Sequence, residues 1–370
     1  MAGIYLHIPF CRQACHYCNF HFATSLQHKN EFLRALLKEA ALQQDYLGGE
    51  VVETIYFGGG TPSLLETGEV RAILLRLREL FPVDPAAEIT LEANPDDFSA
   101  DQVAGWREAG INRLSIGIQS FFDEDLRWMN RAHGAQQARE SIRLARSVFD
   151  NITADLIYGL PGLSNARWQQ NVEELMQSGI PHLSCYALTV EEKTPLLKRI
   201  RTGKAEPVNP DSQSEQFLLL MHWLEQAGFE HYEISNFAKP GFRSRHNTSY
   251  WQGKRYLGLG PSAHSYDLSG RQWNIANNQR YIEALNAGII PFERELLTPV
   301  QQINEYIMTS LRTLEGINLD QVGDLFRESL LKKSQIYQSR GVLIAAEGCL
   351  RLTKEGKLLA DGIAADLFFD

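Results

Sequence analysis

Short runs of β-branched, aromatic and aliphatic residues alternate with helix-like stretches along most of the chain. Repeated strand–helix units of this composition imply right-handed crossovers and a buried parallel sheet. The predicted strands are Gly3–His7, Thr54–Phe57, Glu88–Ala93, Asn112–Gln119, Thr153–Tyr158 and His182–Leu188, with His231–Ser235 as a candidate seventh. The predicted helices cover 32–41, 70–80, Gln102–Glu108, Ala135–Val148, Arg167–Gln177 and Ser214–Gln226. Six such units fit an α/β fold, a partial TIM-like (β/α)6 barrel, with its chemistry at the carboxyl ends of the strands.

The rest of the chain predicts two further regions. Residues 237–291 are rich in Gly, Asn, Tyr and Trp and lack a clear period, which predicts an irregular stretch. From Thr298 the pattern is helical and ends in a predicted hairpin, Val342–Ala345 with Cys349–Leu352. The predicted domains are therefore a barrel at 1–236, an irregular region closing it at 237–297, and a small helical, winged-helix-like domain at 298–370.

Charge and hydropathy exclude several classes of protein. The formal net charge of −9 argues against nonspecific binding to nucleic acid or to anionic membranes. The last predicted domain is not basic either, because it contains eight Lys and Arg but ten Asp and Glu. This balance favours a structural or lid role over DNA binding. The N-terminus has no signal-peptide pattern and no window predicts a transmembrane helix, so we expect a cytoplasmic protein.

Three of the five cysteines lie within eight residues, in the loop after the first predicted strand. Cys11, Cys15 and Cys18 have the spacing C-x3-C-x2-C, which in a reducing compartment indicates a metal site. Iron–sulfur clusters usually take four cysteines, so three would leave one iron open to bind a ligand. Zinc remains the competing metal, because His16 or His21 could supply a fourth ligand.

The motif C-x3-C-x-aromatic-C resembles the signature of the radical S-adenosylmethionine (SAM) superfamily. That resemblance implies a [4Fe–4S] cluster on the three cysteines and Tyr17 near the adenine of SAM. It also implies that SAM chelates the open iron and is cleaved reductively to methionine and a 5′-deoxyadenosyl radical. The glycine-rich segment Phe57–Pro62 matches the segment that contacts the SAM amino group in this superfamily, and glycines let a backbone approach a ligand closely.

Further segments resemble the oxygen-independent coproporphyrinogen III oxidase group. They are Tyr5–Cys11, Ile116–Ser120, Asn130-Arg131 and Asp155–Pro161. The resemblance implies SAM contacts at Tyr5, Gly59, Gly60, Thr61, Glu92, Gln119, Arg131, Asp155 and Ala187, and near His264, whose identity differs from that group.

Two departures argue against the decarboxylase itself. That enzyme carries an extra cysteine two residues after the third cluster cysteine, where this chain has Phe20. It also has a long N-terminal arm, whereas only ten residues precede Cys11 in this sequence. The segment His246–Trp251, H-N-x-x-Y-W, instead resembles the signature of HemW-type heme chaperones.

The chaperone resemblance implies a protein that binds heme and passes it to an acceptor protein. Heme candidates are His246 as an iron ligand, Tyr250 and Trp251 against the porphyrin, and Arg243 and Arg245 for the propionates. We expect a heme chaperone without coproporphyrinogen dehydrogenase activity, with the oxygen-independent oxidase as the alternative. If SAM is cleaved, an electron donor such as flavodoxin or ferredoxin is also expected.

Overall fold

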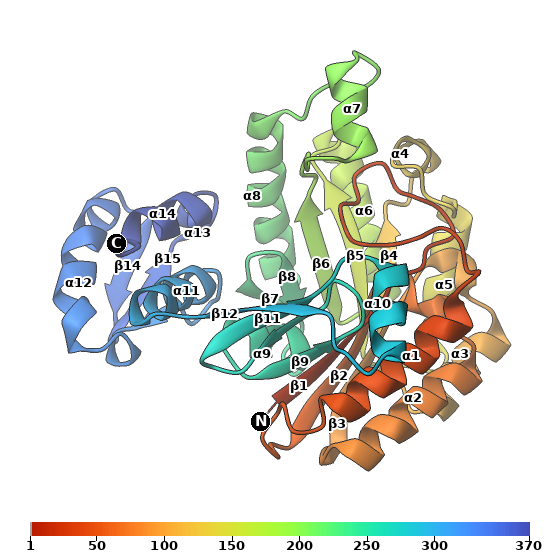
Figure 1. The fold of residues 1–370 in the computed structure, drawn as a ribbon. Helices are drawn as coiled ribbons and strands as arrows, with labels where there is room; N and C mark the ends of the chain where they lie inside the picture. Colours follow the sequence, from red (N-terminus) through yellow and green to blue (C-terminus); the bar gives the residue numbers. More distant parts are fainter. Residues whose placement is uncertain (1) are drawn as a thin grey trace. The chain divides into compact units, whose positions relative to one another are not determined.

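A computed structural model describes residues 2–370 (Figure 1). Contacts within the chain form two compact units. Unit 1 comprises Met1–Asn209 and Lys254–Glu295, and unit 2 comprises Pro210–Gly253 and Leu296–Asp370. The sequence-based division into domains at 1–236, 237–297 and 298–370 stays a prediction.

Unit 1 is built on a parallel sheet whose strands follow the order of the sequence. These strands are β1 (Ala2–Ile8), β2 (Val52–Gly59), β3 (Val83–Ala93), β4 (Arg113–Gln119), β5 (Ile152–Tyr158) and β6 (His182–Ala187). Each pairs with the next in parallel. The six strands predicted from the sequence and the predicted α/β fold class are confirmed. All seven residues of β4 are buried, including the polar side chains of Arg113, Ser115 and Gln119.

Helices connect these strands. They are α1 (Lys29–Leu42), α2 (Thr67–Leu80), α3 (Ala100–Ala109), α4 (Asp123–Trp128), α5 (Ala135–Arg146), α6 (Asn165–Ser178) and α7 (Pro195–Arg201). Figure 1 shows α1, α2 and α3 side by side. In α1 the buried face is Phe32, Leu36 and Ala40, at the spacing of an amphipathic helix. Short helices α4 and α7 were not predicted, because neither is long enough to show a period.

The other edge of the sheet differs from the sequence prediction. Strand β9 (Tyr256–Leu259) pairs in parallel with β1, and β10 (His264–Tyr266), β11 (Gly270–Asn274) and β12 (Phe292–Leu296) continue the sheet. Helix α10 (Asn278–Asn286) lies against α1. The expectation of an irregular stretch at 237–291 was therefore wrong. The seventh parallel strand is β9, since 231–235 belongs to an antiparallel hairpin.

Unit 2 joins two stretches of chain. Its first part contains α8 (Pro210–Gln226), the antiparallel strands β7 (Glu230–Glu233) and β8 (Asn236–Ala238), and α9 (Arg245–Trp251). Its second part contains α11 (Pro299–Leu311), β13 (Ile317–Asn318), α12 (Asp324–Ser339), β14 (Leu343–Ala346), β15 (Cys349–Leu352), α13 (Lys354–Lys357) and α14 (Ala360–Leu367). The predicted terminal hairpin is confirmed, and Glu347 and Gly348 both have positive φ, as its two-residue turn requires.

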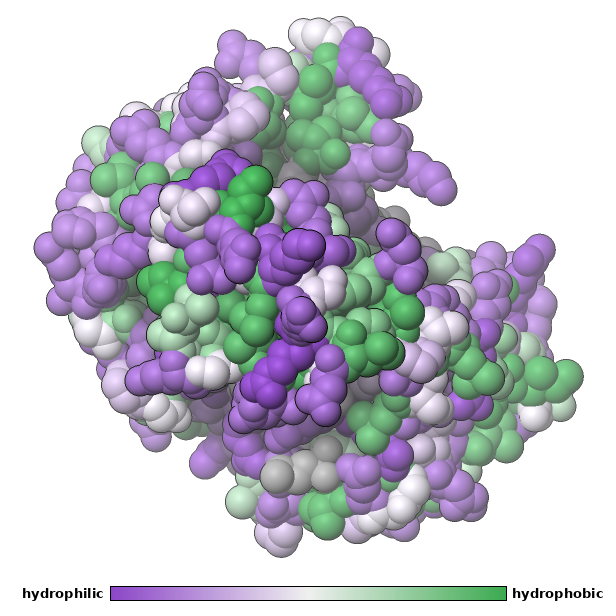
Figure 2. All heavy atoms as spheres, turned by 90° about the vertical axis from the view of Figure 1, so that its left-hand side faces the viewer, coloured by the Kyte–Doolittle hydropathy of each residue, from purple (hydrophilic) through white to green (hydrophobic). Residues whose placement is uncertain are grey.

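The surface is mixed in polarity. Figure 2 shows hydrophilic residues over most of the face that it draws, with apolar residues scattered among them. Among residues 2–370 no helix is long and apolar enough to cross a membrane.

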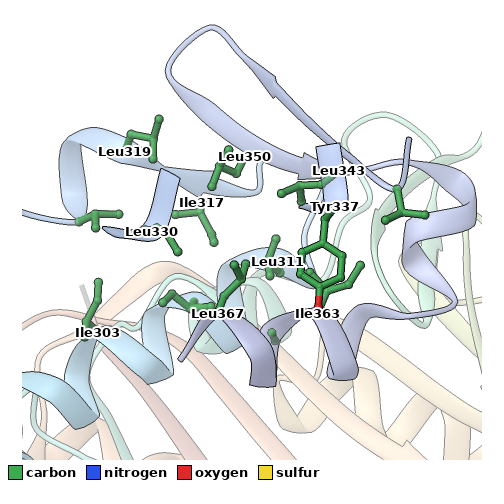
Figure 3. Close-up of a cluster of buried hydrophobic side chains, with 14 residues drawn as sticks. Ile303, Leu311, Ile317, Leu319, Leu330, Tyr337, Leu343, Leu350, Ile363 and Leu367 are labelled. Atoms are coloured by element: carbon green, nitrogen blue, oxygen red, sulfur yellow. The ribbon is translucent and has the colours of Figure 1, made fainter. Parts of the chain in front are cut away.

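The second part of unit 2 has its own apolar core. Leu311, Tyr337, Leu343, Leu350 and Leu367 belong to one buried cluster that helices α11, α12 and α14 share with the small sheet (Figure 3). Each of these side chains is less than a tenth exposed. This packing holds the carboxyl ends of α11 and α12 in place, and a charged residue follows each of these ends.

Candidate functional site

The cysteine loop follows β1 directly. Cys11, Cys15 and Cys18 are all half-buried, and Cys15 lies close enough to raise the pKa of both Cys11 and Cys18. Burial raises the pKa of the Cys11 thiol to about 11, although the Thr61 side chain bonded to it acts in the opposite direction. Burial also raises the pKa of Cys18. Three thiols gathered in one half-buried loop fit a cubane cluster, which holds its thiolate ligands farther apart than a single ion does.

Hydrogen bonds to the segment after α4 fix this loop. Asn130 donates from Nδ2 to the Ala14 carbonyl at 2.7 Å, and Gln13 Nε2 donates to the Asn130 carbonyl at 3.0 Å. The His16 amide donates to the Met129 carbonyl. Asn130 has a φ of +59°, which an Asn tolerates better than most residues. The motif Asn130-Arg131 therefore fixes the conformation of the cysteine loop, a role that the sequence did not indicate.

The two histidines considered as zinc ligands are engaged elsewhere. His16 Nδ1 lies 2.9 Å from the Trp128 carbonyl, and His21 Nε2 lies 2.6 Å from Asn278 Oδ1. Within residues 2–370, no three His, Cys, Asp or Glu side chains lie close enough together to hold a single metal ion.

Arg131 connects the cysteine loop to the sheet. Its Nη1 lies 3.4 Å from both Cys15 Sγ and Tyr17 Oη, and its Nη2 donates to Asn94 Oδ1 at 2.6 Å. A fourth bond reaches the Gly117 carbonyl at 2.9 Å. Burial acts to lower the pKa of this guanidinium, but Tyr17 and Cys15 beside it raise the pKa overall, so the cation is permanent. Its Nε is a buried donor with no acceptor in the described part of the chain.

Buried acids lie near the carboxyl ends of the strands. The Tyr56 hydroxyl donates to Glu92 Oε1 at 2.8 Å, and Ser115 Oγ donates to Asp155 Oδ1 at 3.4 Å. Burial raises the pKa of Glu92 to about 7, and the nearby charge of Asp155 adds to that rise. Burial also raises the pKa of Asp155 to about 6, against hydrogen bonds and arginine charges that lower it. Acids of this kind gain from a ligand that offers an ammonium group or hydroxyl donors.

The remaining strand-end candidates differ in their surroundings. Gln119, with a φ of +67°, has a buried Oε1 that accepts no hydrogen bond from residues 2–370. Tyr5 Oη lies 3.2 Å from His7 Nδ1, and Ala187 ends β6 opposite Tyr158. His264 is exposed at the start of β10, where its ring stacks on Trp273. The unsatisfied donor on Arg131 and the unsatisfied acceptor on Gln119 fit a ligand that carries both kinds of group, as SAM does.

The glycine triplet at the end of β2 has a structural reason of its own. A Cβ on Gly60 would lie 2.5 Å from the Phe10 carbonyl oxygen, and a Cβ on Gly59, at φ +107°, would lie 2.8 Å from the His7 ring. A Cβ on Gly58 would lie 2.8 Å from the Tyr5 ring. These glycines let β2 approach the strand that leads into the cysteine loop, whereas the sequence analysis had explained them by approach to a ligand. Next to them, Thr61 Oγ1 accepts from Asn94 Nδ2 at 3.1 Å.

Asn94 is a residue that the sequence analysis missed. It binds both Arg131 and Thr61 and so ties two of the predicted SAM contacts together. Its position directly after β3 was the available signal, since polar residues at the carboxyl ends of barrel strands are those that face the chemistry.

The heme candidates lie in unit 2, on or next to α9. His246 is 1% exposed, and its Nε2 lies 2.9 Å from Tyr250 Oη. Ser244 caps the helix by accepting from the Asn247 amide. The H-N-x-x-Y-W segment is thus helical, with its first and fifth residues in contact across one turn, as an i,i+4 pair should be.

The two arginines proposed for propionates have different surroundings. Arg243 donates to Glu230 Oε2 at 3.0 Å and to Glu315 Oε1 at 2.7 Å, so its charge is already compensated. Arg245 is exposed. Phe20, which stands where the decarboxylase has its extra cysteine, is 66% exposed.

Family models match two parts of the chain. The radical SAM superfamily model matches residues 5–175, and the model of the HemN C-terminal domain matches residues 297–359. The first covers the cysteine loop and β1 to β5, and the second covers most of the helical end of unit 2.

Full-length relatives give the same picture. The chain is 33% identical to the heme chaperone HemW of Bacillus subtilis, over 98% of both chains. It is 35% identical to the heme chaperone HemW of Mycobacterium tuberculosis, over 99% of this chain and 94% of the relative. It is 31% identical to the mitochondrial radical S-adenosyl methionine domain-containing protein 1 of Bos taurus, over 99% and 87%.

Among solved structures, coproporphyrinogen III oxidase (HemN) from Escherichia coli has a similar fold. The TM-score is 0.86 at 23% identity, over 99% of this chain and 90% of that one. At this identity the likeness concerns the fold.

Proposed function

This chain belongs to the HemW family of the radical SAM superfamily, and from that membership we propose that it binds heme and transfers it to acceptor proteins. The observation that carries the proposal is identity of 33–35% over nearly the whole length to proteins named heme chaperone HemW. Relatives that align from end to end share both compact units, and not the barrel alone.

In this proposal Cys11, Cys15 and Cys18 bind a [4Fe–4S] cluster whose fourth iron position takes SAM. The gathering of three half-buried thiols, and the hydrogen bonds that hold His16 and His21 to other groups, support this assignment over zinc. When bound, the cluster and SAM supply one-electron chemistry. Whether the chain uses that chemistry decides if it needs an electron donor such as flavodoxin or ferredoxin.

The protein's own side chains would position SAM. Arg131 holds its charge next to Cys15 and Tyr17, where it would attract the SAM carboxylate. Glu92 and Asp155 would accept from the ammonium group or the ribose hydroxyls. Tyr5, Gly59, Gly60, Thr61, Gln119, Ala187 and His264 complete the proposed SAM contacts.

Heme is proposed to bind at α9. Ligation of iron by His246 Nε2 would replace its contact with Tyr250 Oη, so the helix must adjust when heme binds. Tyr250 and Trp251 would then contact the porphyrin. Arg243 is held by two glutamates, which argues against it as a propionate partner.

The test is a heme titration of the full chain after anaerobic reconstitution of the cluster. A saturable Soret band is expected, and His246→Ala should weaken binding or shift the band. His28→Ala, which removes an exposed imidazole, is the matched control and should change neither. Absence of a saturable band in the unmodified protein would contradict the proposed function.

The oxidase remains the competing function, and the shared fold with HemN is what favours it. The exposed benzyl group of Phe20 cannot ligate iron or transfer a proton, which argues against decarboxylation. An anaerobic assay with coproporphyrinogen III, SAM and a reductant separates the two. Formation of protoporphyrinogen IX would establish the oxidase instead. The net charge of −9 supports the absence of nucleic-acid partners, and a cytoplasmic location is also part of the proposal.

A further inference from the structure

Unit 2 contains a cavity of about 370 Å³, within the size range of small-molecule sites. Its walls come from the β7–β8 turn, the ends of α11 and α12, and the segment from α13 into α14. The lining residues that matter here are Ile234, Arg312, Tyr337, Arg340, Lys357 and Ile363. Tyr337 and Ile363 also belong to the apolar cluster drawn in Figure 3, which fixes this wall in place.

The cavity has more positive than negative charge. Its two acids are engaged, since Asp361 pairs with Arg312 and Asp366 accepts from the Tyr337 hydroxyl. Arg340, by contrast, forms no ion pair within residues 2–370, and its guanidinium lies 5.8 Å from the centre of the Tyr337 ring. Arg340 is exposed, and a cation that lines a cavity without a counter-ion favours an anionic ligand.

Lys357 is the second cation without an acid in ion-pair contact among the described residues. Its Nζ lies 2.8 Å from His231 Nδ1, and burial lowers the pKa of that imidazole to about 3, so His231 is neutral and accepts. Burial also lowers the pKa of Lys357 to about 8, which leaves the amine mostly protonated at neutral pH. Glu233 attracts the amine from beyond ion-pair distance and is itself bonded to Asn236.

Two buried donors next to the cavity also need acceptors. Arg312 Nε and Trp251 Nε1 are buried and donate to no atom of residues 2–370. The Arg312 guanidinium lies 5.8 Å from the centre of the Trp251 ring. One arginine therefore both lines the cavity and contacts the last residue of α9, the helix assigned to heme. Unsatisfied buried donors cost free energy, and carboxylate oxygens would relieve that cost.

We propose that this cavity receives the propionate carboxylates of heme, with Arg340 and Lys357 as their cationic partners. The inference rests on the proposed function and deepens it, because it moves the propionate site away from Arg243 and Arg245. The apolar wall at Ile234 suits the edge of a porphyrin, and the cations suit the two carboxylates at that edge.

The test is the heme titration of the full chain with Lys357→Gln and Arg340→Gln. Each variant should bind heme about ten-fold more weakly, as expected for the loss of one charge-assisted hydrogen bond. The Soret maximum should not move, because neither residue is the proposed iron ligand. Lys357→Arg keeps the charge and should bind within a few-fold of the unmodified protein. Arg327→Gln, which removes an exposed arginine paired with Asp320, is the matched control.

Heme dimethyl ester, which lacks both carboxylates, completes the experiment. The unmodified protein should bind the ester at least as weakly as either Gln variant binds heme, because the ester loses both carboxylates. The variants should bind the ester no more weakly than the unmodified protein does. Equal heme affinity of the unmodified protein and both Gln variants would overturn the cavity assignment while leaving heme binding intact. Equal losses for heme and ester would also overturn it, since they would reflect packing. No saturable binding in the unmodified protein would instead contradict the chaperone function.

Discussion

Glu39 offers a test of how ionisation affects the sheet edge beside the cysteine loop. The carboxylate on α1 is fully buried and accepts from the Gly260 amide at 2.8 Å and from Asn274 Nδ2 at 2.6 Å. The Tyr281 hydroxyl is its third donor. A Cβ on Gly260 would lie 2.5 Å from the His7 carbonyl, so this network holds the segment after β9 against the strand that leads to Cys11.

The magnitude follows from the pKa of this carboxyl. Burial raises it from 4.5 to about 7, although the three hydrogen bonds act in the opposite direction. That difference corresponds to about 3 kcal/mol in the free energy of unfolding. The folded state holds the proton of Glu39 more tightly than the unfolded state does. The contribution of Glu39 to the free energy of unfolding is therefore fully present below pH 4.5. It is lost as the pH rises to about 7.

The perturbation is Glu39→Gln, with denaturant unfolding followed between pH 4.5 and pH 8. Glutamine cannot ionise. Over this pH range the free energy of unfolding should therefore fall by about 3 kcal/mol less in the variant than in the unmodified protein. Its amide places a donor against the Gly260 amide or the Tyr281 hydroxyl, which costs about 1 kcal/mol at every pH. Glu79→Gln, an exposed position on α2, is the control and should leave the pH dependence unchanged. Identical pH dependence in the Glu39 variant and the unmodified protein would refute the reasoning.

Three further predictions concern the cluster and SAM. Cys15→Ala should abolish the visible cluster absorption and Cys185→Ala, at a buried thiol, should retain it; loss in the second variant would contradict the three-ligand assignment. Asp155→Asn should weaken SAM binding about ten-fold, measured by calorimetry, and should leave the iron content intact. Arg131→Ala should lower both the SAM affinity and the iron content, because Arg131 also contacts the cysteine loop. Unchanged SAM affinity in both would show that these contacts are misassigned. Gly60→Ala should destabilise the chain by about 1–3 kcal/mol, measured by thermal unfolding, since its Cβ meets backbone; an unchanged midpoint would argue against that clash.

The sequence predicted the parallel strands well because each is a buried run with helices on either side. For example, Thr153–Tyr158 was predicted and β5 spans Ile152–Tyr158. It failed at β9, whose four residues include a glycine and carry no alternation. That strand exists because β1 offers it a free edge, which is information from tertiary structure and not from the local sequence. Helix α9, at seven residues, was likewise too short to show a period.

The candidate site shows the same division. That Glu92 and Asp155 lie near strand ends followed from the strand prediction, because parallel strands end at one edge. The partners of Arg243 could not be foreseen, since Glu315 lies 72 residues away in sequence. The sequence offered that arginine as a free cation, and only the folded chain reveals its two acids.

Opposite electrostatics distinguish the two proposed ligand sites. In unit 1, Glu92 and Asp155 are buried acids whose pKa values are raised to about 7 and about 6, so a cationic ligand stabilises their charged forms. In unit 2, Arg340 and Lys357 are cations with no carboxylate in ion-pair contact within residues 2–370, so an anionic ligand stabilises them. SAM carries a sulfonium and an ammonium group, whereas heme carries two carboxylates. Each ligand would therefore meet like charge in the other's site, and like charge in a poorly solvated site costs more than the same charge in water. Although Arg131 would attract the SAM carboxylate, charge thus disfavours exchange of the two ligands and adds to any difference in shape.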